Sequence, residues 1–252
     1  MNKPFILVTN DDGFFAPGIR ALANAMCAVG DVAIAAPETQ QSGVGKHISI
    51  SRPLRTRQRE PLRWSIDGTP SDCVYLAVYG LLPRRPDLVI SGINHGPNLA
   101  EDVWYSGTAG AALEGASIGI PSVAISHDSF SPISFEPAAE FAKRVARFVL
   151  DAGLPTGTIL NVNIPETNGG AVDEYRWVPG GRRNYNRQVN RRIDPRGEEY
   201  FWIGGEGLTH YSISGSDCDT LASGVATITP IKLDATDLNC LAELRAKDLP
   251  RF

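Results

Sequence analysis

The segment spanning residues 6–13, ILVTNDDG, constrains the fold of this chain more than any other part of the sequence. An apolar run typical of a buried strand is followed there by two adjacent carboxylates, Asp11 and Asp12, and by Gly13. Ligands of open α/β sheets bind beyond the carboxyl ends of the strands, so this pair points to a hard cation, to a phosphate held through that cation, or to both. Neighbouring side chains of a strand face opposite ways, so both carboxylates reach one site only if Gly13 allows a sharp turn. The alternative is a plain strand-to-helix turn in which one aspartate caps the next helix.

Length and composition are those of an ordinary globular protein. The 252 residues can form one large α/β domain with an appendage or two small domains. The hydrophobic fraction of 42% and the charged fraction of 21% are typical of such proteins, and no apolar run approaches the length of a membrane span. Residues 1–8 are too short for a signal peptide. We therefore expect a cytoplasmic protein that does not associate with membranes.

The cysteines and the net charge argue against two further classes. The four cysteines are far apart and form no CxxC pair, so neither a zinc ribbon nor a disulfide framework is expected. We expect them to be small buried hydrophobic residues. The net charge of −4 argues against general nucleic-acid affinity.

The order of apolar segments predicts an α/β core with parallel strands and right-handed crossovers. Strands are expected at residues 6–9, 32–36, 48–50, 54–57, 62–66, 88–90, 122–126 and 158–163. Helices are expected at residues 16–29, 69–81, 108–119 and 137–152. From residue 165 onward, glycines, arginines and aromatic residues replace this alternation. The sequence therefore predicts a core domain over residues 1–165, with hairpins and a tail over residues 166–252.

Two further segments carry candidate binding residues. The strand at residues 88–90 ends in a polar turn that contains Asn94 and Asn98, and the tips of two neighbouring strands can converge on one ion. The alternative for this segment is a plain turn. The segment Ser106–Gly107–Thr108 lies at the start of a predicted helix, where free N–H groups bind anions and glycine allows close approach of a phosphate. The alternative there is a simple helix cap.

Several motifs, in this order along the chain, resemble the SurE family of metal-dependent nucleotidases. They are VTNDDG at residues 8–13 with PGI at 17–19, AP at 36–37, SG at 42–43, GTPSDCV at 68–74, SGINHGPN at 91–98, YSGT at 105–108 and ALEGA at 112–116. The distal half adds DPRG at 194–197, YFWIGG at 200–205 and DCD at 217–219. Each string is weak alone, but their order covers nearly the whole chain. The resemblance implies a Rossmann-like, three-layer parallel-sheet core with C-terminal hairpin arms.

The same resemblance implies which residues form the site. Asp11, Asp12, Ser42 and Asn94 would hold one divalent cation per subunit. Two carboxylates, a hydroxyl and an amide oxygen suit Mg²⁺ or Mn²⁺, whereas zinc would be expected to recruit His or Cys. The substrate and its phosphate would contact Asn10, Asn94, Asn98, Ser106, Gly107 and Thr108.

The implied activity is hydrolysis of nucleoside monophosphates to nucleoside and phosphate, with 3′-nucleotidase and exopolyphosphatase side activities. Asp11 and Asp12 would be the catalytic residues, and the sequence does not choose which of them acts as base. An aspartyl-phosphate route is less favoured, because Gly13 and Phe14 occupy the positions where that chemistry normally has a second aspartate and a threonine. The alternative is a nucleotide-binding regulatory module without turnover, against which the intact carboxylate pair argues.

Three features are not explained by this scheme. Lys46 stands where the family often has a histidine, and His95 either contacts substrate or faces solvent. Residues 176–196 mix seven arginines with Tyr185, which is typical either of nucleic-acid or polyphosphate binding or of an arm that pairs with a neighbouring subunit. The resemblance implies homodimers or homotetramers joined through the distal segments, so we favour the arm and do not expect stable nucleic-acid binding.

Overall fold

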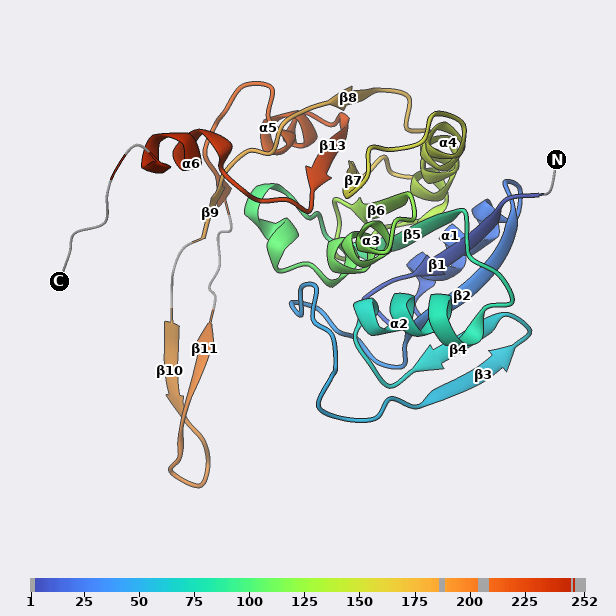
Figure 1. Ribbon diagram of the computed structural model, residues 1–252. Coiled ribbons are helices and arrows are strands. Elements are labelled where there is room, and N and C mark those ends of the chain that lie inside the picture. The colour runs from blue at the N-terminus through green and yellow to red at the C-terminus, as the bar shows by residue number, and fades with distance from the viewer. Residues whose placement is uncertain (1–2, 186–188, 204–208, 246, 248–252) are drawn as a thin grey trace.

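The computed structural model describes residues 3–185, 189–203, 209–245 and 247, and it has one large mixed sheet covered by helices (Figure 1). The strands are β1 Phe5–Thr9, β2 Asp31–Pro37, β3 Thr56–Glu60, β4 Arg63–Ile66, β5 Leu88–His95, β6 Ser122–His127, β7 Thr158–Ile164, β8 Tyr175–Trp177, β9 Arg183–Asn184, β10 Val189–Ile193, β11 Glu199–Ile203, β12 Thr209–His210 and β13 Ala226–Lys232. The helices are α1 Pro17–Met26, α2 Pro70–Leu76 with the π-helical turn η1 Ala77–Leu81, the 3₁₀ helix η2 Ala100–Trp104, α3 Gly107–Ser117, α4 Glu136–Ala152, α5 Asp217–Ala222 and α6 Leu238–Arg245.

The central sheet has nine strands in the order β3-β4-β2-β1-β5-β6-β7-β13-β8. The six strands from β4 to β7 in this order run parallel. At the two ends of this parallel block, β3 pairs antiparallel with β4 and β13 pairs antiparallel with β7. The predicted α/β fold class with a mostly parallel core sheet is confirmed. The carboxyl ends of β1 and β5 therefore lie side by side, because these two strands pair directly.

Strand β1 explains why the core has three layers. All five of its residues are buried, and their side chains alternate between the two faces of the sheet. Ile6 and Val8 pack in the same apolar cluster as residues of α1 and α4, whereas Phe5 and Leu7 pack with residues of α2. Helices thus cover both faces of the strand that carries the aspartate pair.

Two predicted strands differ in the structure. Residues 48–50 form no strand: the Ser49 N–H donates to Asp72 Oδ1 at 2.8 Å, so the segment bonds to the start of α2 and not to a sheet. The strand expected at residues 88–90 continues to His95 through a bulge between Ser91 and Asn94. Asn94 therefore belongs to a strand that pairs with β6 and not to a turn.

The distal half contributes to the same sheet. Strand β13 pairs antiparallel with β7, and β8 lies beside β13. The division at residue 165 remains a prediction about folding units, because the sheet itself continues beyond it. The predicted hairpins are represented by β10 and β11, which pair antiparallel and extend away from the sheet (Figure 1). Arg187, one of the seven distal arginines, lies outside the described residues.

The cysteines only partly match the prediction. Cys73 and Cys218 are buried, as expected, whereas Cys27 and Cys240 are exposed, and all four are free thiols. Cys27 is the cap residue just after the last turn of α1. No described helix has the length and apolar character that a membrane span requires.

The contact between α1 and β5 gives a stability prediction. A Cβ atom on Gly18 would overlap the main-chain oxygen of Ile93, one residue before Asn94. Gly18→Ala should therefore destabilise the protein by about 1–3 kcal/mol, the usual cost of overpacking, as measured by urea unfolding. Gly80→Ala is the matched control, because a Cβ there meets no atom within 4 Å. Equal stability of the two variants would contradict the packing shown here.

Candidate active site

A cavity of about 570 Å³ lies at the carboxyl ends of β1 and β5, beside the start of α3. Five of the predicted site residues line it, namely Asp11, Ser42, Asn94, Asn98 and Ser106. They come from segments that are far apart in the sequence. The parallel sheet brings them together because its strands end at one edge.

The turn after β1 is closed by Asn10. Its side-chain amide donates to the Gly13 carbonyl at 3.0 Å, and its side-chain oxygen accepts from the Gly13 N–H at 3.3 Å. Gly13 has a φ of +105°, which favours glycine and permits the predicted sharp turn. Asn10 is fully buried and does not line the cavity, so in this structure its side chain shapes the turn that presents the two aspartates.

Asp11 is the most buried acid of the cavity, with 3% of its surface exposed. Burial raises the pKa of Asp11 to about 6, the nearby charge of Asp12 adds to the rise, and a hydrogen bond from the Thr108 hydroxyl opposes it. That hydroxyl donates to Asp11 Oδ1, and the Gln41 N–H donates to the Asp11 main-chain oxygen at 2.7 Å. Asp11 is therefore fixed between β1, the following loop and α3.

Asp12 is fixed by His95, a contact that the sequence did not predict. Asp12 Oδ2 lies 3.0 Å from His95 Nδ1 and accepts from the His95 main-chain N–H at 3.3 Å. The His95 ring packs edge-on against Phe135, with 4.9 Å between the ring centroids. His95 also lines the cavity, so it does not simply face solvent. The bulge in β5 determines this placement, and no local sequence signal reports it.

The oxygen atoms near this pair fit a hard divalent cation. Asn94 is 9% exposed and donates its amide to the Gly96 carbonyl at 2.7 Å. Its side-chain oxygen has no hydrogen-bond partner among the described residues, so it is available to a ligand. Ser42 is exposed on the cavity wall, and its hydroxyl accepts from the Gln40 amide at 3.0 Å. No group of three His, Cys, Asp or Glu side chains in the described ranges is placed to hold a metal, so a cation here would need neutral oxygens beside the two carboxylates.

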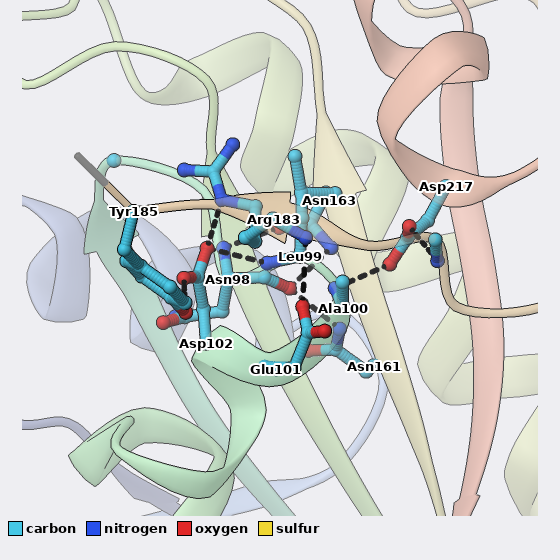
Figure 2. A network of polar contacts seen from close by, with 12 residues as sticks. Asn98, Leu99, Ala100, Glu101, Asp102, Asn161, Asn163, Arg183, Tyr185 and Asp217 are labelled. Carbon is cyan, nitrogen blue, oxygen red and sulfur yellow. Dashed lines mark hydrogen bonds and ion pairs between the residues drawn. The ribbon is translucent and has the colours of Figure 1, made fainter. Parts of the chain in front are cut away.

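Asn98 is held by the neighbouring strands β6 and β7. Its main-chain N–H donates to Asn163 Oδ1 at 2.7 Å, and its side-chain amide donates to Ser126 Oγ at 2.9 Å. The amides of Asn161 and Asn163 both donate to the Asn98 carbonyl (Figure 2). This buried network fixes Asn98 at the cavity wall before any ligand binds.

The start of α3 lies directly against Asp11. Ser106 caps the helix, because its hydroxyl accepts from the Ala109 N–H at 3.0 Å. A Cβ on Gly107 would lie 2.8 Å from the Cβ of Asp11 and 3.2 Å from the Gln41 main-chain oxygen. Only glycine allows this approach, which places a positive helix end beside the carboxylates. A bulky side chain at position 107 would therefore displace Asp11 or the Gln41 main chain.

Lys46 has a role inside the protein. Its amine lies 3.0 Å from Glu114 Oε2, and the Glu114 side chain is buried on α3. Lys46 does not line the cavity. Lys46 therefore pairs with a buried acid and connects its loop to α3. The replacement of the family's usual histidine by Lys46 does not alter any residue that lines the cavity.

Several cavity residues were not among the predicted site residues, although His95 was considered as a possible substrate contact. They are Gly43, His95, Pro97, Asp102, Tyr105, Asp128, Phe130, Arg183 and Tyr185. Arg183 and Tyr185 belong to the arginine-rich segment, which the sequence assigned to nucleic acid or to a neighbouring subunit. In the structure both contact Asp102 of their own chain: Arg183 Nε lies 2.9 Å from Asp102 Oδ2, and the Tyr185 hydroxyl donates to Asp102 Oδ1 at 2.5 Å.

Fold and site together define an α/β protein whose strand ends carry an acidic, oxygen-rich centre that faces a helix N-terminus. Residues 6–187 match the family model described as survival protein SurE. The chain belongs to the SurE family, and the resemblance found in its motifs is confirmed.

Similar proteins match over almost the full length. The chain is 42% identical over 245 residues to a protein of Geotalea uraniireducens named 5′-nucleotidase SurE, covering 97% of this chain and 99% of that protein. It is 45% identical over 251 residues to a protein of the same name from an Anaeromyxobacter species, covering 98% and 97%. The crystal structure of the SurE protein from Aquifex aeolicus matches with a TM-score of 0.85 and 38% identity, covering 96% of this chain and 99% of that chain.

The pKa of Asp11 gives a stability prediction for the metal-free protein. Because the folded pKa is about 6 and the ordinary value is 3.8, ionised Asp11 destabilises the fold above pH 3.8, and the effect is complete above pH 6. In the presence of a chelator, Asp11→Asn should therefore stabilise the protein by up to about 3 kcal/mol at pH 7.5, and the gain should vanish toward pH 4. Chemical denaturation at both pH values measures it, and a variant less stable than the parent at pH 7.5 would refute it.

Proposed function

We propose that this chain is a divalent-metal-dependent nucleotidase that hydrolyses nucleoside monophosphates to nucleoside and inorganic phosphate. The observation that carries the proposal is the meeting of the buried Asp11 carboxylate with the N-terminus of α3 at one cavity, with Asp12 held next to Asp11 by the cavity residue His95. Carboxylates alone would repel a phosphate, and a helix end alone would not hold a cation. Their combination suits a phosphate ester that binds between a cation and the helix. The name 5′-nucleotidase of the relatives supports the same reaction.

In this proposal Asp11, Asp12, Ser42 and Asn94 hold one Mg²⁺ or Mn²⁺ per subunit. Such a cation, when bound, neutralises phosphate charge and lowers the pKa of water. The Ser106 and Asn98 side chains, with N–H groups at the start of α3, bind the phosphate, and the Thr108 hydroxyl holds Asp11 beside it. Asp11 or Asp12 takes a proton from the attacking water. His95 holds Asp12 in place, whether Asp12 acts as this base or only as a cation ligand.

A regulatory module that binds nucleotides without turnover is not favoured. Both strand-end carboxylates are present, and the buried charge of Asp11 has no fixed basic partner in the described part of the chain. In a site that only bound nucleotide, a second carboxylate close to the first would add charge repulsion without improving affinity for the phosphate. The pair is useful when a cation is needed at the reacting phosphate.

We further propose that the protein forms homodimers or homotetramers through its distal hairpin. Strands β10 and β11 expose large apolar side chains: Ile203 is 91% exposed, Ile193 65% and Trp202 64%. The hairpin projects from the body of the protein, where a second copy can cover it (Figure 1). This use of the segment agrees with the arm predicted from the sequence. A cytoplasmic location and the absence of stable nucleic-acid binding remain predictions from the sequence.

The proposed reaction predicts an absolute cation requirement. Phosphate release from a panel of nucleoside monophosphates should occur with Mg²⁺ or Mn²⁺ and should cease after chelation. Asp12→Asn should lower kcat at least about a hundredfold, because it removes a ligand charge and the partner of His95. Asp67→Asn, at a solvent-exposed ion pair with Arg52, is the matched control and should behave as the parent does. Full turnover in chelator would exclude the proposal.

The oligomer proposal predicts that charge on the hairpin separates the subunits. Trp202→Asp should reduce the molar mass measured by light scattering to that of a single chain, because it places a charge in an apolar contact. Tyr79→Asp replaces a similarly exposed aromatic residue on η1 and should leave the mass unchanged. An unaltered mass for the hairpin variant would show that the subunits join elsewhere.

A further inference from the structure

We propose that Arg183 binds the nucleoside part of the substrate and thereby sets the preference for nucleotides over simpler phosphate esters. This inference rests on the proposed nucleotidase function and adds a specificity residue to it. Arg183 comes from the distal part of the chain, outside the strand ends and loops that supply the proposed cation and phosphate ligands.

The main chain brings Arg183 to the cavity. Its N–H donates to Glu101 Oε2 at 2.7 Å, which joins β9 to the helix η2 (Figure 2). On its other side β9 pairs with β12, and the Tyr211 N–H donates to the Arg182 carbonyl at 3.0 Å. These are main-chain contacts of the strand, so the position of Arg183 does not depend on its side chain.

The Arg183 side chain is buried but has unused donors. Only 9% of it is exposed, and it lines the cavity. Nε lies 2.9 Å from Asp102 Oδ2 in an ion pair whose geometry falls outside that of a hydrogen bond. Among the described residues, neither terminal nitrogen of the guanidinium has a hydrogen-bond partner (Figure 2). Because buried donors without acceptors are costly, this arrangement suits a ligand with acceptor atoms.

The charges around Arg183 favour a neutral ligand over a second phosphate. Asp102 already pairs with the guanidinium, and Asp128 lines the same cavity. Burial raises the pKa of Asp128 and the charge of Arg183 opposes the rise, so the two side chains face one region. Two carboxylates around one guanidinium leave a net negative charge, which repels a phosphate but accepts hydroxyl groups. Ribose hydroxyls and base edges supply both the donors and the acceptors that this set needs.

The aromatic side chains nearby suit a nucleobase. Tyr185, Tyr105 and Phe130 line the cavity, and Tyr185 is oriented by its hydrogen bond to Asp102. Flat aromatic rings stack on any base, with little dependence on its identity. Asp102 thus orients both the guanidinium and the Tyr185 ring, and its main-chain oxygen accepts from the Ser106 N–H at 3.0 Å. The proposed nucleoside end therefore adjoins the proposed phosphate end at Ser106.

The test compares two substrates that share the reacting phosphate. Adenosine 5′-monophosphate carries a nucleoside, whereas phenyl phosphate lacks ribose and base acceptors. In the holoenzyme with its supporting cation, Arg183→Ala should lower kcat/KM for the nucleotide about tenfold, mainly by raising KM, because charged hydrogen bonds to the nucleoside are lost. The ratio of the two kcat/KM values, nucleotide over phenyl phosphate, should fall at least about fivefold.

Two further variants separate binding from structure. Arg182→Ala removes the neighbouring arginine, which stacks on Tyr211 at 5.1 Å and does not line the cavity, and should leave the ratio unchanged. Arg183→Lys retains the charge beside Asp102 but not the forked donors, so it should fold as the parent does and show a lowered ratio.

The outcomes are distinct. An equal loss on both substrates in Arg183→Ala, with an unchanged melting temperature, would assign Arg183 to the reacting phosphate and overturn the inference. A parental ratio in Arg183→Lys, beside an Arg183→Ala variant of lowered melting temperature, would assign it a structural role and overturn the inference as well. A parent enzyme that releases phosphate from neither substrate would instead refute the proposed function, and the inference with it.

Discussion

The approach of α3 to the tip of β1 is the contact on which the rest of the site depends. Gly107 leaves room for it, and the Thr108 hydroxyl donates to Asp11 at the point of contact. The positive helix end lowers the cost of burying a carboxylate there. Burial nevertheless outweighs that help, since the pKa of Asp11 is still raised to about 6. The fold therefore keeps a buried negative charge at the edge of the cavity, which a divalent cation would offset.

Much of the fold could be predicted because its central strands are buried on both faces. Such strands read as continuous apolar runs, and β1, β2 and β7 were expected within one or two residues of their observed bounds. The start of α2 was clear from Thr69 and Pro70, whose cap and first-turn positions are observed. Prediction failed where a distant contact overrode the local pattern. Ser49 bonds to Asp72, and β5 continues through a bulge that no residue pattern signals.

The site divides in the same way. Asp11, Asn94 and Ser106 could be placed together from sequence, because parallel strand ends and the following helix start share one edge of the sheet. His95 could not be assigned, since its ring reaches Asp12 only after the bulge in β5 redirects the strand. Arg183 could not be assigned either. Its partner Glu101 is 82 residues away, and an arginine-rich segment indicates a charged surface without indicating which acid it will meet.

The two ends of the cavity differ in charge and in origin. At the strand ends, Asp11, just after β1, stands beside the N-terminus of α3, where the proposed reaction would need a cation before a phosphate could bind. At η2, the guanidinium of Arg183 already neutralises Asp102, and aromatic rings replace further charge. The first end is built on the buried sheet, whereas the second is completed by a two-residue strand from the distal chain. If the proposed roles hold, catalysis depends on the buried core and recognition on a short added strand, and the hydrogen bond from the Ser106 N–H to the Asp102 carbonyl joins the two ends.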